Sequence, residues 1–156
     1  IVQSFEYVLI MILAQLPGYI AAAWLVEKLG RKATLAGFIG LCAVSAYFFG
    51  QASSVGMIVF WGCLMSFFNL GAWGVLYTYT PEQYPTNIRA FGSGWASAVG
   101  RMGGIVAPLV VTQMMVMHNG FSYVFMMFTA VLLAVALVIV LLGEETRGKT
   151  LESIGL

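Results

Sequence analysis

Charge is what this sequence has least of: Lys, Arg, Asp and Glu make up 8% of the 156 residues, and Asp is absent. A soluble domain of this size could not cover its surface with so few charges, because 61% of the residues are hydrophobic. The net charge of +1 excludes the basic surface of a nucleic-acid-binding protein. Two cysteines, Cys42 and Cys63, and one histidine, His118, form neither a metal-ligand spacing nor an enzymatic constellation. The sequence therefore predicts a protein surrounded by lipid, with no metal, cofactor or enzymatic activity.

Five apolar stretches are long enough to cross a bilayer, which takes about 20 helical residues. They cover residues 5–26, 33–50, 56–79, 91–117 and 121–143, and a polar tail follows at 144–156. The stretches are continuously apolar rather than alternating, which favours helices over the strands of a membrane barrel. The predicted fold is all-α: a polytopic transmembrane bundle of five helices.

The basic residues indicate how this bundle is oriented. They lie in or beside the first and third breaks between the stretches, or in the tail: Lys28, Arg31, Lys32, Arg89, Arg101, Arg147 and Lys149. Basic loops stay in the cytoplasm, so both breaks and the C-terminus are predicted there, with Ile1 outside. The chain starts within the apolar pattern and has its N-terminus predicted outside. This suggests that an odd number of helices precedes Ile1 and that the chain is part of a longer protein.

The first break, within WLVEKLGRKATL, has a glycine between two helices. Gly30 permits an unusual backbone angle there, and charged residues surround it. The string resembles the loop signature that joins the second and third helices of each half in the major facilitator superfamily. The matching positions are Glu27, Lys28, Gly30, Arg31 and Lys32. The family usually has Asp for Glu27 and Gly for Ala23; an unrelated basic inner loop would explain the charges but not the glycine.

The third break, YTPEQYPTNIRAFGSG, contains two prolines. Pro81 and Pro85 are expected to end the preceding helix and stiffen the loop. The string resembles the PE-x-x-PT-x-x-R cytoplasmic signature of the sugar-porter and organic-ion branches of the same superfamily. The matching positions are Pro81, Glu82, Pro85, Thr86 and Arg89. The tail EETRGKTLE, with Glu145 and Arg147, is similar to the stretch that closes sugar porters, although Glu144 stands where they usually carry Pro.

The charged residues of these motifs suggest a gate on the cytoplasmic side. Ion pairs linking Glu82, Arg31, Arg89 and Glu145 would hold helices together on the inner side in one state and separate in another. The resemblance implies that these pairs stabilise the outward-open state. Exposed pairs contribute only about 0–1 kcal/mol each, so several would have to act together. Solvated loop charges without a gating role are the alternative.

Polar and aromatic residues inside the apolar stretches are candidates for solute binding. Asn69, Trp73 and Tyr77 follow one another at four-residue intervals and share a helix face. An amide beside two aromatic rings can hydrogen-bond to and stack on a flat solute. Gln15 and Tyr19 form a similar pair in the first stretch. Helix packing is the alternative for Asn69 and Trp73, and an interfacial position for Tyr77.

Arg101 lies about 15 Å inside the fourth stretch, at a helical rise of about 1.5 Å per residue. A charge near the bilayer centre costs about 2.5–3.5 kcal/mol on insertion scales, so it should face a cavity or a partner. The surrounding SAVGRMGGIVAPLV is similar to the matching helix of organic-ion transporters, in which anion carriers tend to hold Arg. A structural pairing or snorkelling towards the inner face is the alternative. A proton-coupling carboxylate in this chain would have to be Glu6.

Taken whole, the sequence is similar to the C-terminal five helices of a twelve-helix superfamily member, closest to bacterial metabolite and niacin-type permeases of the sugar-porter-like branch. The resemblance implies one partial domain, residues 1–156, that works with an N-terminal half in a bacterial plasma membrane. It implies secondary active transport by alternating access, with symport of a proton as one coupling. A small organic anion such as nicotinate is the first substrate hypothesis. A sugar or organic cation is the second, and a receptor or vesicle protein that does not transport is the third.

Overall fold

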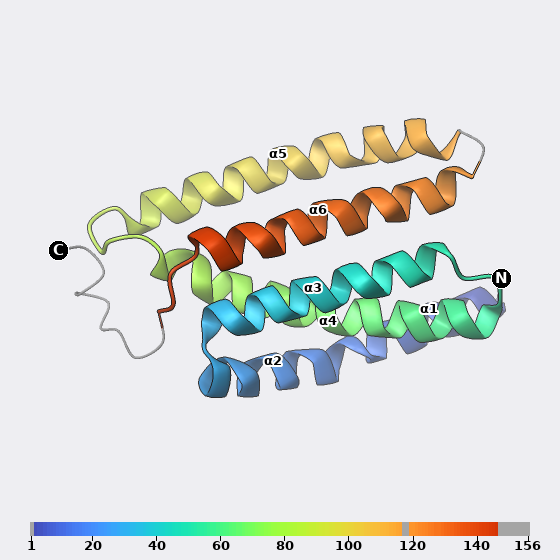
Figure 1. Cartoon of the computed structure of the whole chain (residues 1–156), viewed down its shortest axis with the longest axis horizontal. Helices are drawn as coiled ribbons and strands as arrows, with labels where there is room; N and C mark the ends of the chain where they lie inside the picture. Colours follow the sequence, from blue (N-terminus) through green and yellow to red (C-terminus); the bar gives the residue numbers. More distant parts are fainter. Residues whose placement is uncertain (1, 117–118, 147–156) are drawn as a thin grey trace.

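The computed structural model of the chain describes residues 2–116 and 119–146, so Arg147 of the predicted tail motif lies outside the described part. In these ranges the chain forms α1 (Val2–Leu13), α2 (Gln15–Leu29), α3 (Arg31–Gly50), α4 (Val55–Glu82), α5 (Arg89–Met115) and α6 (Gly120–Leu142). The first two helices together make one apolar span, and five spans are long and apolar enough to cross a membrane. Figure 1 shows the long helices lying roughly side by side. The predicted all-α bundle is confirmed.

The helices extend further into the polar breaks than the sequence predicts. Only Gly30 separates the end of α2 at Leu29 from the start of α3 at Arg31. The helix α4 ends at Glu82, between the two prolines that were expected to end it, and thus runs one residue past Pro81. A proline is tolerated in a last turn, where its missing N–H removes a single hydrogen bond. The first polar break therefore consists almost entirely of helix ends, whereas the second and third keep loops at residues 51–54 and 83–88.

The first span is broken at Ala14, between α1 and α2. Pro17 explains the break, because it has no N–H to donate to the Leu13 carbonyl and its ring crowds that group. The next residue, Gly18, lets α2 approach α4 closely, since a Cβ at this position would collide with the Phe67 carbonyl oxygen. The second half of the span, α2, is thus packed against α4.

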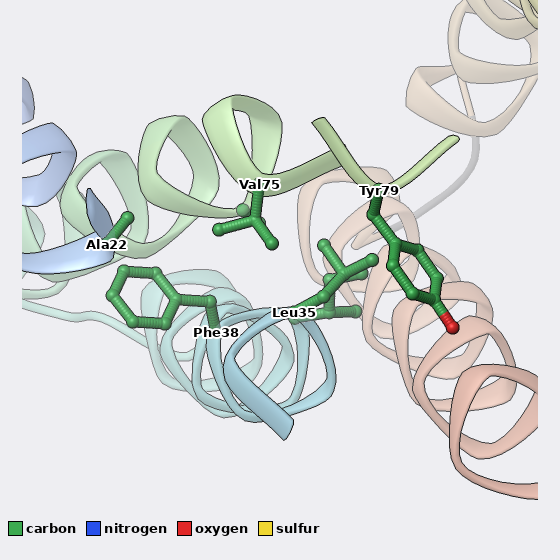
Figure 2. Packing of buried hydrophobic residues seen from close by; sticks show 7 residues of the cluster. Ala22, Leu35, Phe38, Val75 and Tyr79 are labelled. Carbon is green, nitrogen blue, oxygen red and sulfur yellow. The ribbon is translucent and has the colours of Figure 1, made fainter. Parts of the chain in front are cut away.

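The core lies where α2, α3 and α4 meet. Figure 2 shows Ala22 of α2, Leu35 and Phe38 of α3, and Val75 and Tyr79 of α4 packed together, with the Tyr79 hydroxyl directed away from the cluster. Partly buried residues of α6 pack against the same cluster: Leu132, Ala136 and Ile139. Close packing of side chains is what holds helices together in lipid, where apolar burial by itself stabilises little. The helix at the centre of this arrangement is α3.

The helix α5 lies at the edge of the bundle, beside α6 (Figure 1). None of its described residues is buried, in contrast to the nine buried residues of α3. A Cβ at Gly100 or Gly104 would have no neighbour within 4 Å in the described chain. Most of the α5 surface therefore faces whatever surrounds this chain.

Candidate functional site

The three charged motifs come together at one end of the bundle. Figure 1 shows the α2–α3 turn, the α4–α5 loop and the segment after α6 at this end, and the α3–α4 and α5–α6 connections at the other. The side chains at this end come from segments far apart in the sequence. Their hydrogen bonds and one ion pair join seven residues beside Gly30 into a group, the clasp: Arg31, Tyr79, Glu82, Gln83, Glu144, Glu145 and Thr146.

Gly30 makes the turn between α2 and α3 possible. Its backbone has φ +95° and ψ 169°, a conformation that residues with a side chain rarely adopt. This confirms the unusual backbone angle that the sequence predicts. Gly30 is also buried, and a Cβ there would lie 2.5 Å from Oε2 of Glu145. The glycine therefore serves both the turn and the close approach of a carboxylate.

The Glu145 carboxylate caps the start of α3. The backbone N–H of Arg31 donates to Oε1 of Glu145 over 3.0 Å, although the two residues are 114 positions apart. A helix start leaves backbone N–H groups without partners and carries a partial positive charge, so a carboxylate stabilises it. The segment after α6 thus supplies the capping side chain that α3 lacks in its own sequence, where the N-cap is Gly30.

Glu82 joins α4 to the same region. Its Oε2 lies 3.4 Å from Nε of Arg31, in an ion pair whose side chains are 19% and 28% exposed. The hydroxyl of the buried Thr146 donates to the same carboxylate oxygen. Glu82 therefore connects α4 with the start of α3 and with the segment after α6.

Two further contacts involve residues that the sequence analysis did not assign to this site. The Tyr79 hydroxyl donates to the backbone carbonyl of Glu144 over 2.8 Å, and Nε2 of Gln83 donates to the same oxygen over 3.3 Å. Tyr79 lies in the last turn of α4 and Gln83 directly follows the helix, and both donors meet the segment after α6. Their spacing of four residues, which places them on one helix face, was the only signal in the sequence.

Arg89 does not take part in the predicted set of ion pairs among the described contacts. Its Nε donates to the carbonyl of Pro81 over 3.0 Å, and its guanidinium also reaches the Thr86 hydroxyl at 3.4 Å. The residues of the third-break motif therefore hydrogen-bond to one another and stabilise the conformation of the α4–α5 loop. The remaining predicted residues lie around the clasp: exposed Glu27 at the end of α2, half-buried Lys32 at the start of α3, and half-buried Pro85 in the loop.

The candidates for solute binding lie on α2 and α4. Trp73 and Tyr77 pack edge to face, with ring centroids 5.4 Å apart. The Tyr19 ring of α2 lies over Gly74 of α4, the residue after Trp73. Asn69 is exposed one turn away on α4, and Gln15 is half-buried at the start of α2. These residues form one polar and aromatic surface across two neighbouring helices.

Arg101 is separate from this surface. It is exposed in the middle of α5, which contacts α4 and α6 but not α2. No described contact brings its guanidinium to the aromatic residues of α2 and α4. The structure therefore groups four of the predicted solute-binding residues and leaves Arg101 on the exposed helix.

The five apolar spans, joined at one end by the clasp, define an integral membrane protein of the helical-bundle class. The family model of the Major Facilitator Superfamily matches residues 5–155, and the chain belongs to this family.

Several relatives make the comparison more specific. The chain is 84% identical to the niacin transporter NiaP of Acinetobacter baylyi, over 100% of this chain and 36% of that protein. A Bacillus subtilis protein, named provisionally as the niacin/nicotinamide transporter NiaP, is 57% identical over 97% of this chain and 38% of its own length. The organic cation/carnitine transporter 7 of Arabidopsis thaliana is 31% identical over 95% of this chain and 29% of its own. The chain thus spans little more than a third of the length of the two NiaP relatives.

Proposed function

We propose that the chain is the C-terminal part of a bacterial plasma-membrane transporter that moves nicotinate, or a closely related aromatic carboxylate, by alternating access. The observation that carries this proposal is the 84% identity, over the full chain, to a protein named as a niacin transporter. Because the chain covers 36% of that relative, the solute site would include residues from the rest of the transporter. Its C-terminus would lie in the cytoplasm, because the basic breaks lie at that end.

The clasp would act as a stiffener of this half of the transporter. Its described contacts join α3, α4 and the segment after α6, which are all parts of the same chain. In alternating access, two halves rock against each other as nearly rigid units around a central site. The clasp would keep the inner ends of three spans together during this motion. Contacts of the same charged groups with the other half would close the inner side of the transporter.

Arg101 would neutralise the carboxylate of the solute. It lies 12 positions after the first residue of α5, which places it about 18 Å along the helix and close to the bilayer centre. An exposed guanidinium at that depth needs an anionic partner or water. The aromatic surface of α2 and α4 would contact the ring of the same solute once the other half completes the cavity. Proton coupling in this chain would fall to Glu6, which is exposed on α1.

Uptake of labelled nicotinate by cells that express the full-length transporter tests this proposal. Loss of a hydrogen bond to a charged group costs about 1.5–3 kcal/mol, so Arg101→Ala should raise the apparent KM about tenfold or more. Met102→Ala, at the exposed neighbour on α5, is the matched control, and Arg101→Lys tests the charge alone. Membrane abundance is measured for each variant.

The outcomes separate the candidate functions. Uptake that is lost in Arg101→Ala and kept in Met102→Ala supports an anion carrier with Arg101 in its site. Equal uptake in both variants would make Arg101 structural. If the wild-type transporter takes up an organic cation instead, the second candidate gains, which the 31% identity to an organic cation/carnitine transporter favours. Uptake of no solute would point to a receptor or vesicle protein.

A further inference from the structure

The ring of Tyr19 occupies the space that a side chain at position 74 would need. A Cβ built on Gly74 would lie 2.7 Å from Cε1 of Tyr19 and 3.0 Å from its Cδ1. Real Cβ atoms do not approach other atoms so closely, so any residue larger than glycine would displace the ring. Gly74 thus holds α2 and α4 in a contact in which an aromatic ring lies directly on the α4 backbone.

This contact places three aromatic rings around one short segment of α4. Gly74 directly follows Trp73 and precedes Tyr77 by three residues, and those two rings pack edge to face. All three rings remain accessible, with Tyr19 43%, Trp73 49% and Tyr77 65% exposed. Rings that served only to join α2 to α4 would be buried between them. The exposed faces are therefore available to a ligand.

We propose that Gly74 is a specificity-determining residue, which positions Tyr19 so that Tyr19, Trp73 and Tyr77 form an aromatic recess for the planar ring of the solute. This inference rests on the proposed function and assigns the recess to solutes with a flat, unsaturated ring. Aromatic rings attract one another in stacked and edge-to-face arrangements, which a saturated sugar ring or an aliphatic cation chain cannot reproduce. Gly74 acts through Tyr19 and does not touch the solute.

The kind of clash at Gly74 makes the proposal testable without loss of the fold. At Gly18 an added Cβ would meet the backbone of Phe67, which has no way to move aside. At Gly74 it would meet the outer atoms of a tyrosine side chain, which can rotate away. Gly74→Ala should therefore relocate the Tyr19 ring and leave the packing of α2 on α4 in place.

The experiment measures the concentration dependence of solute uptake by the full-length transporter in a double-mutant cycle. Gly74→Ala, Tyr19→Leu and the combined variant are compared with the wild type, using nicotinate, benzoate, glucose and carnitine. Gly40→Ala is the matched control, because nothing lies within 4 Å of a Cβ at that mid-helix glycine. Membrane abundance and maximal uptake rate are recorded for each variant, so that binding is separated from expression.

The expected result is a rise of about three- to tenfold in the apparent KM for nicotinate in Gly74→Ala, the size of one lost aromatic contact. Tyr19→Leu should show a similar rise, and Gly74→Ala should change KM by less than about twofold when Tyr19 is already Leu. Gly40→Ala should keep the wild-type KM. Tyr19→Phe should retain more uptake than Tyr19→Leu, because it keeps the ring.

Two results would overturn the inference and leave the proposed function standing, and a third would overturn both. If wild-type uptake of nicotinate is present and Gly74→Ala keeps the wild-type KM, Gly74 has no role in specificity. If Gly74→Ala raises KM equally with Tyr19 and with Leu, it does not act through this ring. Wild-type uptake of glucose or carnitine alone, or of no solute, overturns both the recess and the aromatic carboxylate. Uptake of benzoate but not of nicotinate would change the proposed substrate from nicotinate to benzoate and leave the recess in place. The same double-mutant cycle would then test the recess with benzoate.

Discussion

A single methyl group at Gly30 should disturb the α2–α3 turn and the clasp together. The backbone conformation of Gly30, φ +95° and ψ 169°, is essentially restricted to glycine, and a side chain there costs about 1–3 kcal/mol. The added Cβ would also lie 2.5 Å from the Glu145 carboxylate, which would have to leave the backbone N–H of Arg31. Loss of a hydrogen bond to a charged acceptor costs about 1.5–3 kcal/mol. The Glu145 carboxylate is only half-buried, so the sum of the two costs is reduced somewhat. We therefore expect Gly30→Ala to lower the free energy of unfolding by about 2–5 kcal/mol.

The assay measures the melting temperature of the full-length transporter in detergent. The signal is the fraction of protein that remains monodisperse after heating to each temperature. Gly40→Ala is the control, since it adds the same methyl group to a helix glycine without a neighbour. In a Glu145→Ala background the collision is gone and only the backbone cost remains, so Gly30→Ala should destabilise by about 1.5–3 kcal/mol less there. Equal melting temperatures for Gly30→Ala and Gly40→Ala would refute the reasoning.

Three further predictions use the same melting assay. Arg31→Gln or Glu82→Gln should each cost no more than about 1 kcal/mol, because both side chains are partly exposed; a larger loss would mean that the pair is more than a surface ion pair. Gly18→Ala should cost about 1–3 kcal/mol by pressing against the Phe67 backbone, and a melting temperature equal to wild type would contradict the tight α2–α4 contact. Tyr79→Phe removes one hydrogen bond to a backbone carbonyl and should cost about 0.5–1.5 kcal/mol. An unchanged melting temperature would show that water replaces this bond.

The helices could be predicted because their signal is local. A run of about 20 apolar residues has only one stable arrangement in lipid, the helix, so composition along the chain locates each span. The boundaries were less accurate, because charged residues such as those on either side of Gly30 also extend helices beyond the hydrocarbon. Pro81 shows the same limit, since a proline in the last turn of a helix costs little.

The candidate site was predictable only as a list of residue types. The charged motifs identified Arg31, Glu82 and Glu145, but not that the Glu145 carboxylate accepts a hydrogen bond from the backbone at the start of α3. Arg89 has the right charge for an ion pair and instead bonds to a carbonyl eight residues away. Which atoms meet depends on the rotation of each helix about its axis, and hydropathy carries no information about that rotation.

By itself the sequence determined the fold class, the number of spans, the end at which the basic residues gather and the need for glycine at position 30. Each of these follows from chain-local chemistry: apolar length, charge and backbone freedom. Only the tertiary structure decided that the segment after α6 closes the clasp, that Tyr19 lies over Gly74, and that Arg101 is set apart on an exposed helix. These facts arise from contacts between residues distant in the chain, which form only when the helices pack at particular distances and rotations.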